Sequence, residues 1–278
     1  MKIGIIGAGA MGCIYGMYLS AKNEVLLVDV VKAHVDAINE KGLSFTHLDG
    51  VTKNYKIKAT MDTTGCEPAE LVILLTKGYQ SAQALEANSS LIGPETLVLS
   101  LQNGYGNADE IVKYVPEDRI LLGTSGGGAI VATHIGSLSG DHDKARLVVK
   151  FMQDCGVPDV VFEENVKALV WSKVFVNIGI NAICALIGDT NQCIANNPYA
   201  NAASYALVKE AVAIANATGM DFDFEAEFKN TVDIALVTGG NICSMLADVN
   251  NKRRTEVDRI NGAAVSEGAK VGMAAPLN

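Results

Sequence analysis

Residues 2–12 read KIGIIGAGAMG, an apolar run that leads into three closely spaced glycines. Their spacing is G-x-G-x-x-G. Gly7 permits a tight turn, Gly9 lets the backbone approach a pyrophosphate, and Gly12 allows the next helix to pack closely. We predict a strand over 2–6, a helix over 10–21 and a dinucleotide site at the start of that helix. The residues of that site are Gly7, Ala8, Gly9, Ala10, Met11 and Gly12.

The pattern continues outward from this turn as alternating strands and helices. Apolar runs at 24–29, 70–76, 96–102 and 119–124 are typical of parallel strands buried on both faces. Helical patterns lie at 31–41, 78–90 and 106–114. From about residue 164 only helices are expected, at 165–187, 199–217, 223–237 and 253–270. We predict an α/β fold, with a Rossmann-type doubly wound parallel sheet over 1–163 and an all-helical domain over 164–278.

Composition excludes several classes of partner. The net charge is −9 and no basic run occurs, so nucleic acid and anionic membranes are not expected to bind. The six cysteines form no C-x-x-C pair, and the four histidines lie far from them in sequence. We expect reduced thiols, no metal site, no signal peptide, no membrane span and a cytoplasmic protein.

Asp29 ends the second apolar run and bears on the choice of cofactor. A carboxylate at this position accepts hydrogen bonds from the adenosine ribose hydroxyls and repels a 2′-phosphate, which favours NADH over NADPH. Lys32 lies just beyond and offers a phosphate some compensation. Alternatively, Asp29 caps the following helix, and both roles can hold at once.

Three other predicted strands end in polar motifs, which should surround the cofactor. Lys77 and Gln80 in TKGYQ could reach its phosphates or amide, and Asn103 in LQNGYG could face its nicotinamide. Ala129 lies in the third motif, GTSGGGA. Each of these residues could instead serve only in a turn or a helix cap.

A polar stripe interrupts the apolar helix expected at 165–187. Lys173, Asn177 and Asn181 are four residues apart, so they share one helix face. Burial of an unpaired ammonium group is unfavourable, and a lysine beside two amides suits a small polyfunctional ligand. The alternative is a lysine that extends from the helix edge to water.

A second polar cluster, SMLADVNNKRRTEVDRINGA, spans 244–263 and contains Ser244 and Glu256. Glu256 could be a solvated helix carboxylate, and Ser244 could be a helix N-cap. On one unbroken helix the two residues would lie about 18 Å apart. They can share a pocket only if Ser244 belongs to a preceding bend or short helix.

Taken in order, these motifs resemble the ketopantoate reductase family over essentially the whole chain. The resemblance implies NAD(P)H-dependent reduction of 2-dehydropantoate, or a related branched 2-oxo acid, to (R)-pantoate in pantothenate and coenzyme A biosynthesis. NADPH is the family norm.

The resemblance also implies residue roles. Lys173 is the general acid and polarises the carbonyl, and Glu256 positions the hydroxyl and carboxylate of the substrate. We also assign Glu256 to catalysis and to the cofactor. Asn103, Asn177, Asn181 and Ser244 hold the substrate, while Lys77, Gln80, Asn103 and Ala129 contact the cofactor. We expect this second cluster and the Lys173 stripe to meet the nicotinamide at one site.

Three features depart from the family pattern. Many members have an arginine just after the second strand, where this chain has Asp29-Val30-Val31. Between 132 and 133 the chain is about ten residues shorter than the family pattern, as if a β-hairpin were deleted or not recorded, and it stops at APLN, where members continue with a further helix. Whether residues are missing at these two points stays open.

Two alternative functions stay open. One is a β-hydroxyacid dehydrogenase of the 6-phosphogluconate dehydrogenase-like type, which Ser244 and Glu256 disfavour. The other is a non-catalytic dinucleotide-binding regulatory protein, which the complete polar set disfavours. The apolar helical domain leads us to expect a homodimer.

Overall fold

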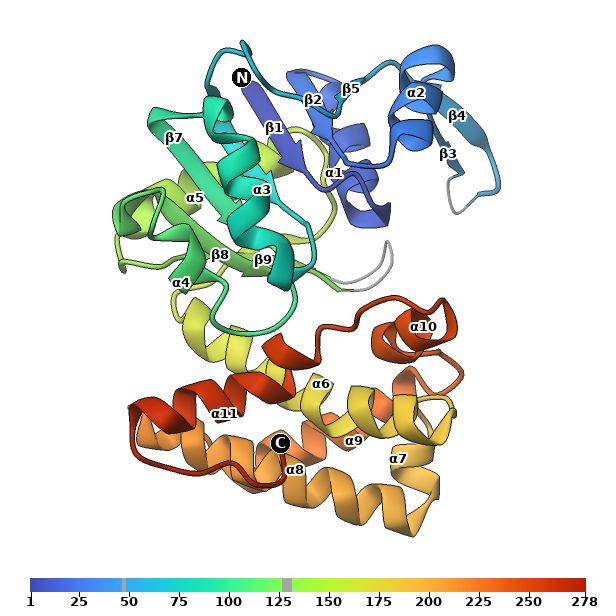
Figure 1. Ribbon diagram of the computed structural model, residues 1–278, viewed down its shortest axis with the longest axis vertical. Coiled ribbons are helices and arrows are strands. Elements are labelled where there is room, and N and C mark those ends of the chain that lie inside the picture. The colour runs from blue at the N-terminus through green and yellow to red at the C-terminus, as the bar shows by residue number, and fades with distance from the viewer. Residues whose placement is uncertain (47–48, 127–131) are drawn as a thin grey trace. The chain divides into compact units, whose positions relative to one another are not determined.

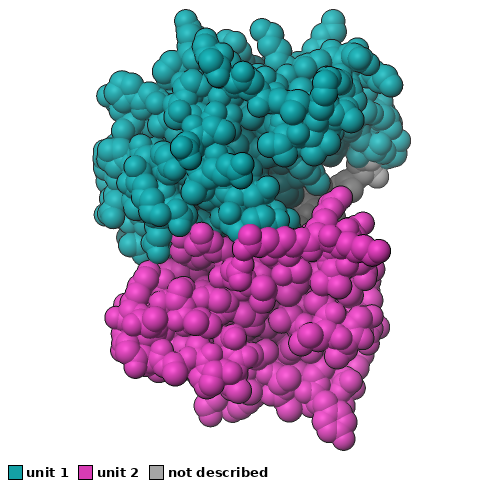
Figure 2. Space-filling model, in the orientation of Figure 1, with its two compact units in different colours: residues 1–102, 107–167 teal, residues 103–106, 168–278 magenta. Residues whose placement is uncertain are grey.

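The computed structural model describes residues 1–46, 49–126 and 132–278. The chain forms two compact units (Figure 2). Unit 1 contains residues 1–102 and 107–167, and unit 2 contains residues 103–106 and 168–278. The short segment 103–106 therefore belongs with the helical unit, although it follows a strand of unit 1. The predicted domain bounds, 1–163 and 164–278, stay a proposal.

Unit 1 is built on an eight-stranded sheet in the described residues, with the order β10-β9-β8-β7-β6-β1-β2-β5. Every neighbouring pair is parallel except β8 and β9. A separate antiparallel hairpin pairs β3 with β4. The strands are β1 (Lys2–Ile6), β2 (Glu24–Val28), β3 (Leu43–Thr46), β4 (Thr52–Tyr55), β5 (Lys58–Thr60), β6 (Ala69–Leu74), β7 (Ile92–Ser100), β8 (Ile120–Thr124), β9 (Thr133–Ser137) and β10 (Val160–Phe162).

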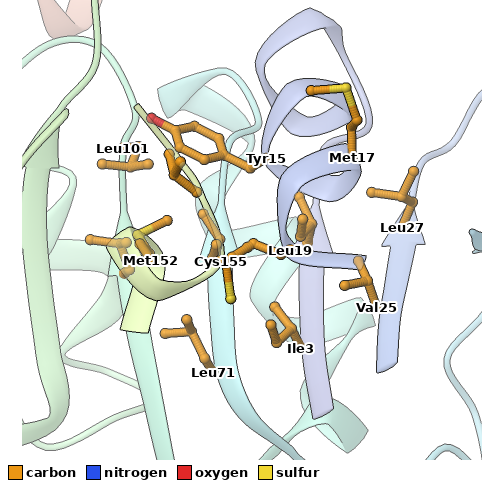
Figure 3. Packing of buried hydrophobic residues seen from close by; sticks show 14 of the residues in the cluster. Ile3, Tyr15, Met17, Leu19, Val25, Leu27, Leu71, Leu101, Met152 and Cys155 are labelled. Carbon is orange, nitrogen blue, oxygen red and sulfur yellow. The ribbon is translucent and has the colours of Figure 1, made fainter. Parts of the chain in front are cut away.

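Helices cover both faces of this sheet (Figure 1). Helices α1 (Ala10–Ser20), α2 (Lys32–Lys41) and α5 (His142–Asp154) share one apolar cluster with it, and α3 (Ser81–Ala87) and α4 (Ala108–Ile111) share another. Alternate strand residues point to opposite faces: Ile3 packs in the cluster of Tyr15 and Met152 (Figure 3), and Ile6 packs in that of Leu85. The predicted doubly wound α/β architecture is confirmed.

The strand order fixes where a ligand can bind. From β1 the chain proceeds to β2 and β5 on one side, and then returns to β6 on the other. The order therefore reverses between β1 and β6, and in open α/β sheets ligands bind at the carboxyl ends of strands beside such a switch point. The glycine turn follows β1, and the TKGYQ loop follows β6.

Some elements of unit 1 differ from those predicted. The sheet is mixed, because β9 runs antiparallel to β8. The helix expected at 106–114 is the shorter α4, and the one expected at 78–90 splits into η1 (Gly78–Gln80), α3 and η2 (Ser89–Leu91). A further turn, η3, spans Glu117–Arg119. The β3–β4 hairpin was not predicted, because its short polar strands lack a continuous apolar run.

Unit 2 is helical and packs around α6. Trp171, Phe175 and Ile178 on α6 are fully buried. A Cβ on Gly179 would lie 2.6 Å from Thr231 Cγ2 and 2.7 Å from Ser204 Oγ, so α6, α8 and α9 approach closely there. The elements are α6 (Val166–Ile187), which begins in unit 1, α7 (Cys193–Asn196), α8 (Pro198–Ala217), α9 (Phe224–Val237), α10 (Ser244–Asn250), the 3₁₀ turn η4 (Val257–Arg259) and α11 (Asn261–Lys270).

The helix expected over 253–270 is wrong in its first part. Residues 253–256 are irregular, η4 follows, and α11 begins only at Asn261. Ser244 lies on the separate short helix α10. The condition that allows Ser244 and Glu256 to share a pocket is therefore met.

Helix α6 is long and apolar enough to cross a membrane, with a mean hydropathy of 1.7 in its most apolar 18-residue window. Half of that window is buried inside the protein. Because α6 supplies the core of unit 2, its packing accounts for its high hydropathy. The apolar character of this one helix is therefore only weak evidence for a membrane span.

Candidate functional site

The glycine turn after β1 has a geometry that only glycine tolerates. Gly7 has φ 103°, and a Cβ there would lie 2.8 Å from the carbonyl carbon of Leu75. A Cβ on Gly12 would lie 2.0 Å from the Gly7 carbonyl oxygen. These contacts match the structural roles expected of the two glycines: Gly7 turns the chain beside β6, and Gly12 lets α1 rest on the turn.

Gly9 differs from these two glycines, because apart from its chain neighbours no described atom lies within 4 Å of the position of a Cβ. It is the N-cap of α1 and provides no side chain to accept hydrogen bonds from the first turn. Backbone N–H groups at the start of a helix bind anions well. The turn formed by Gly7 to Gly12, which includes Ala8, Ala10 and Met11, thus fits a dinucleotide pyrophosphate.

Asp29 lies directly beside this turn. Its Oδ2 accepts a hydrogen bond from Ala8 N at 3.0 Å, and its Oδ1 accepts one from Val31 N at 2.9 Å. The carboxylate thus fixes the end of β2 against the glycine turn, and it stays partly exposed. It does not cap α2, because the N-cap residue of that helix is Val31 and no side chain accepts a capping hydrogen bond there, so the capping alternative is wrong. The Lys32 ammonium pairs with Asp36 Oδ2 at 2.6 Å, so it is already engaged by an anion.

His34 also contacts this turn, although we assigned it no role from the sequence. Its Nε2 lies 2.8 Å from the Ala8 carbonyl oxygen. Since a carbonyl only accepts, Nε2 carries the proton in this contact. The same carbonyl oxygen also accepts from Cys13 Sγ at 3.2 Å. In the sequence, the only indication of this contact was a histidine in the first turn of the helix that follows Asp29.

Lys77 and Gln80 lie in the loop after β6, where both are partly buried. Lys77 precedes η1, and Gln80 is the N-cap residue of α3. Leu75 N donates to Ile6 O at 2.8 Å, which holds this loop beside the glycine turn. Ala129 lies outside the described residues, so its predicted cofactor contact is not described.

Gln102 is a positioning residue that the sequence analysis missed. It is buried, and its Nε2 donates to Thr76 O at 3.0 Å and to Ser81 Oγ at 2.9 Å. Its Oε1 accepts from Ser100 Oγ at 3.1 Å. Gln102 thus joins the end of β7 to both ends of the 76–81 loop. A polar residue directly after an apolar strand run was the available signal.

In unit 2, the predicted stripe lies on one continuous helix. Lys173, Asn177 and Asn181 are all on α6, where Lys173 and Asn177 are partly buried and Asn181 is 5% exposed. The row extends about 12 Å along the helix axis. The opposite face carries the Trp171 and Phe175 core.

Glu256 lies near the Lys173 end of this row. It is 5% exposed, which excludes the solvated-carboxylate alternative, and its charge acts on Lys173. Burial lowers the pKa of Lys173 to about 8, while the neighbouring Glu256 carboxylate raises it. The backbone carbonyl of Glu256 accepts from Arg259 N and Ile260 N, so η4 fixes this residue in place.

Ser244 is exposed at the start of α10, and its neighbour Cys243 links it to the stripe. The Cys243 thiol donates to the Asn181 carbonyl oxygen at 3.6 Å. Cys243, not Ser244, is the N-cap residue, since its Sγ accepts from Leu246 N at 3.4 Å. The Ser244 hydroxyl is therefore not used as the N-cap of α10.

Asn103 begins the segment 103–106, which packs within unit 2. Tyr105 N donates to Arg259 O at 2.9 Å, and the Tyr105 ring stacks on Trp171 with centroids 4.4 Å apart. Gly104 has φ 86°, and a Cβ there would lie 2.3 Å from Arg259 O. Asn103 and Lys173 thus belong to the same unit.

This set of groups can bind an anionic, carbonyl-containing ligand. It combines a lysine whose pKa is about 8, a buried carboxylate, two amides on one face of α6 and a hydroxyl at the start of α10. Such a lysine can deliver a proton to a developing alkoxide, and the amides can orient the ligand.

Comparisons with known proteins find the same family for both units. A family model described as "Ketopantoate reductase PanE/ApbA" matches residues 3–137, and the model of its C-terminal part matches residues 165–278. The 2-dehydropantoate 2-reductase of Streptococcus pyogenes serotype M1 is 32% identical over 295 residues, covering 99% of this chain and 94% of that protein. The Pyrococcus horikoshii protein of the same name is 33% identical, covering 100% and 94%.

Solved structures agree as well. A D-mandelate dehydrogenase with NADH and anilino(oxo)acetate has a TM-score of 0.90 at 29% identity, covering 100% of this chain and 94% of that one. The 2-dehydropantoate 2-reductase of Geobacter metallireducens has a TM-score of 0.89 at 24% identity, covering 100% and 96%, and this likeness shows the fold alone.

Proposed function

Because the chain belongs to the ketopantoate reductase family, we propose that it is an NAD(P)H-dependent oxidoreductase that reduces 2-dehydropantoate to (R)-pantoate. This reaction serves pantothenate and coenzyme A biosynthesis. The observation that carries the proposal is the partly buried Lys173, with its lowered pKa, beside the buried Glu256.

Each polar residue of unit 2 has a separate role in this proposal. Lys173 donates a proton to the substrate carbonyl oxygen as negative charge develops there. Asn177, Asn181 and Ser244 orient the carboxylate and hydroxyl groups. Glu256 keeps Lys173 protonated near neutral pH and anchors the terminal hydroxyl.

The bound cofactor would supply the hydride. The residues that would hold it are the turn Gly7 to Gly12 and Asp29, with Lys77, Gln80 and Asn103 at neighbouring strand ends. We propose NADH as the preferred form, because Asp29 presents a carboxylate where NADPH has its 2′-phosphate. The similar D-mandelate dehydrogenase was solved with NADH.

Two glycine substitutions separate cofactor binding from folding. We expect Gly9→Ala to leave the melting temperature nearly unchanged but to weaken dinucleotide binding about tenfold or more, because the new methyl group lies where the pyrophosphate approaches. Gly12→Ala should instead destabilise the protein by about 1–3 kcal/mol, because its Cβ would overlap the Gly7 carbonyl oxygen. Thermal unfolding and fluorescence titration with NADH measure the two effects. Unchanged NADH affinity in Gly9→Ala would contradict this assignment.

The pH profile reports on Lys173. Lys173 must be protonated to donate, so kcat/KM for reduction should be level below its pKa of about 8 and fall about tenfold per pH unit above it. Glu256→Gln removes the carboxylate that raises this pKa, so the midpoint should move to lower pH. Lys167→Gln, at an exposed position on α6, is the control and should keep the midpoint. A midpoint that does not move in Glu256→Gln would contradict the coupling.

The direct test is cofactor oxidation with 2-dehydropantoate and with other branched or aryl 2-oxo acids, with NADH and NADPH in parallel. A second substrate class is worth testing, because the ligand in the D-mandelate dehydrogenase structure is itself an oxo acid. We expect the highest kcat/KM with 2-dehydropantoate. No turnover of any 2-oxo acid with either cofactor would defeat the proposal.

Neither alternative function gains support. The two family models cover both the sheet unit and the helical unit, whereas a regulatory protein needs only the first. The relatives are named 2-dehydropantoate 2-reductases rather than β-hydroxyacid dehydrogenases.

Assembly and location are further parts of the proposal. We propose a homodimer, because unit 2 exposes large apolar side chains such as Leu186, Tyr199 and Val237, each more than 80% exposed. Sedimentation at several concentrations tests the dimer, and a monomer at every concentration would refute it.

We also propose a cytoplasmic location, because all six cysteines are free thiols. The expected lack of nucleic-acid, membrane and metal partners stays a prediction.

A further inference from the structure

Three free cysteines of unit 2, Cys184, Cys193 and Cys243, lie close to Asn181. Cys184 is on α6, almost one turn after Asn181, and its Sγ lies 3.6 Å from that of Cys193 at the start of α7. Cys243 lies beside the same part of α6, because its Sγ is 3.6 Å from the carbonyl oxygen of Asn181. The three sulfurs thus connect α6, α7 and α10. In the described residues, no group of three or more His, Cys, Asp or Glu side chains has the geometry to hold a metal ion. We therefore consider the reactions of the thiols themselves.

Cys243 connects this thiol cluster to the predicted substrate residues. Its Sγ donates to the carbonyl of Asn181 and accepts from Leu246 N in the first turn of α10. The next residue, Ser244, is the first of that helix. A change in bonding at the Cys243 sulfur therefore acts on the backbone at Asn181 and on the position of Ser244.

We propose that Cys243 and Cys184 are a redox modification site, in which a hydroperoxide converts the two thiols into a reversible disulfide. The Cys243 sulfur attacks a peroxide oxygen, the O–O bond breaks, and water or an alcohol leaves, which produces a sulfenic acid. The Cys184 sulfur then attacks the Cys243 sulfur, the S–S bond forms, the S–O bond breaks, and water leaves. Two thiols are oxidised by two electrons and one peroxide is reduced.

The surroundings of Cys243 favour it as the first thiol to react. It is 7% exposed, against 0% for Cys184 and 3% for Cys193, and the flanking Ile242 and Ser244 are exposed. Its hydrogen bonds with Cys184 and with the backbone of α10 also hold the pKa of Cys243 below its usual range. Cys13 in unit 1 is expected to be less reactive, because burial and the Asp29 carboxylate raise its pKa to about 11.

Oxidation should also change activity, and this part rests on the proposed function. A sulfur in a disulfide no longer donates to the Asn181 carbonyl, and it moves toward Cys184. We therefore expect a fall of about tenfold or more in kcat/KM for the 2-oxo acid, since a displacement of about 1 Å can have that effect.

The experiment treats the full-length protein with limiting hydrogen peroxide, alkylates the remaining thiols, and maps peptides by non-reducing mass spectrometry. We expect one linked pair, Cys184 with Cys243, together with the loss of activity, and both should reverse with dithiothreitol. Cys243→Ser should keep the cap, because serine caps helices well, and it should resist both effects. Cys66→Ser removes a partly exposed thiol of unit 1 and should behave as wild type.

Two results would overturn the proposal. One is that Cys243 is still alkylated after peroxide treatment, or is found as sulfinic acid with no linked peptide. The other is an activity loss that persists unchanged in Cys243→Ser. The linked peptide is measured without any substrate, so its absence is distinguishable from a failure of the proposed function.

Discussion

Replacement of Lys173 by methionine is expected to lower kcat for 2-oxo acid reduction by about 10²–10⁴-fold, with NADH affinity nearly unchanged. Methionine matches the length of the lysine stem but supplies neither a proton nor a positive charge at the carbonyl oxygen. The residues of the predicted dinucleotide turn lie in unit 1, whereas Lys173 lies in unit 2. Steady-state kinetics and fluorescence titration with NADH measure the two quantities separately.

Lys167→Met is the matched control for this variant. Lys167 is exposed on the same helix, so its loss should change kcat less than about twofold, as is usual for surface substitutions. If Lys173→Met retained wild-type turnover, Lys173 would not be the general acid, and the catalytic assignment would fail.

The stability of the same variant shows whether a loss of activity reflects chemistry or unfolding. The pKa of Lys173, about 8, lies below the ordinary lysine value of 10.5, so the fold opposes the charged form at neutral pH. Lys173→Met should therefore be more stable than wild type near pH 7, by about 1–3 kcal/mol. The difference should shrink between about pH 8 and pH 10.5, where the folded wild-type lysine loses its proton first. Thermal unfolding across pH measures it.

The sequence was most informative where burial and local pattern agree. The continuous apolar runs at β1 and β8 predicted the right bounds to within one residue, because parallel strands buried on both faces leave little room for polar residues. The glycine spacing was equally informative, since a Cβ at Gly7 or Gly12 would overlap backbone atoms. The row of Lys173, Asn177 and Asn181 needed only helical periodicity.

The sequence misled where tertiary contacts override a local pattern. The segment 253–260 looks helical because Val257 and Ile260 continue the apolar spacing of Ala263 and Ala264. Arg254 and Asp258 also have the spacing of a helical ion pair, and they pair at 2.7 Å. The chain is nevertheless irregular at 253–256, directly after Lys252 with φ 54°, only the short turn η4 follows, and Glu256 is buried. Likewise, periodicity cannot predict that 103–106 joins unit 2, because the contacts of Tyr105 with Arg259 and Trp171 connect distant parts of the sequence.

Asp29 leads to the second large effect, on the choice between NADH and NADPH. Its carboxylate is fixed by Ala8 N and Val31 N and stays partly exposed at the end of β2. A fixed anion there can accept from ribose hydroxyls but repels a 2′-phosphate. Lys32, the nearest cation in sequence, is paired with Asp36 and offers that phosphate little compensation.

We therefore expect wild-type kcat/KM with NADH to exceed that with NADPH by about 100-fold, which corresponds to about 2.7 kcal/mol. Asp29→Asn removes the charge and should reduce this ratio at least about tenfold. Adding Asp36→Asn should reduce it further, because Lys32 is then released to meet the phosphate. Both variants are assayed with the two cofactors at the same ionic strength, since screening weakens the repulsion.

Glu24→Gln provides the control for these variants, because Glu24 is an exposed carboxylate at the opposite end of the same strand. It removes the same unit of charge from the protein but should leave the cofactor ratio unchanged. A similar shift in Glu24→Gln would mean that net charge, not the local anion, sets the preference. A wild-type protein that oxidises NADPH faster than NADH would contradict the role of Asp29, because repulsion at the end of β2 would then be outweighed by cations that the sequence pattern did not reveal.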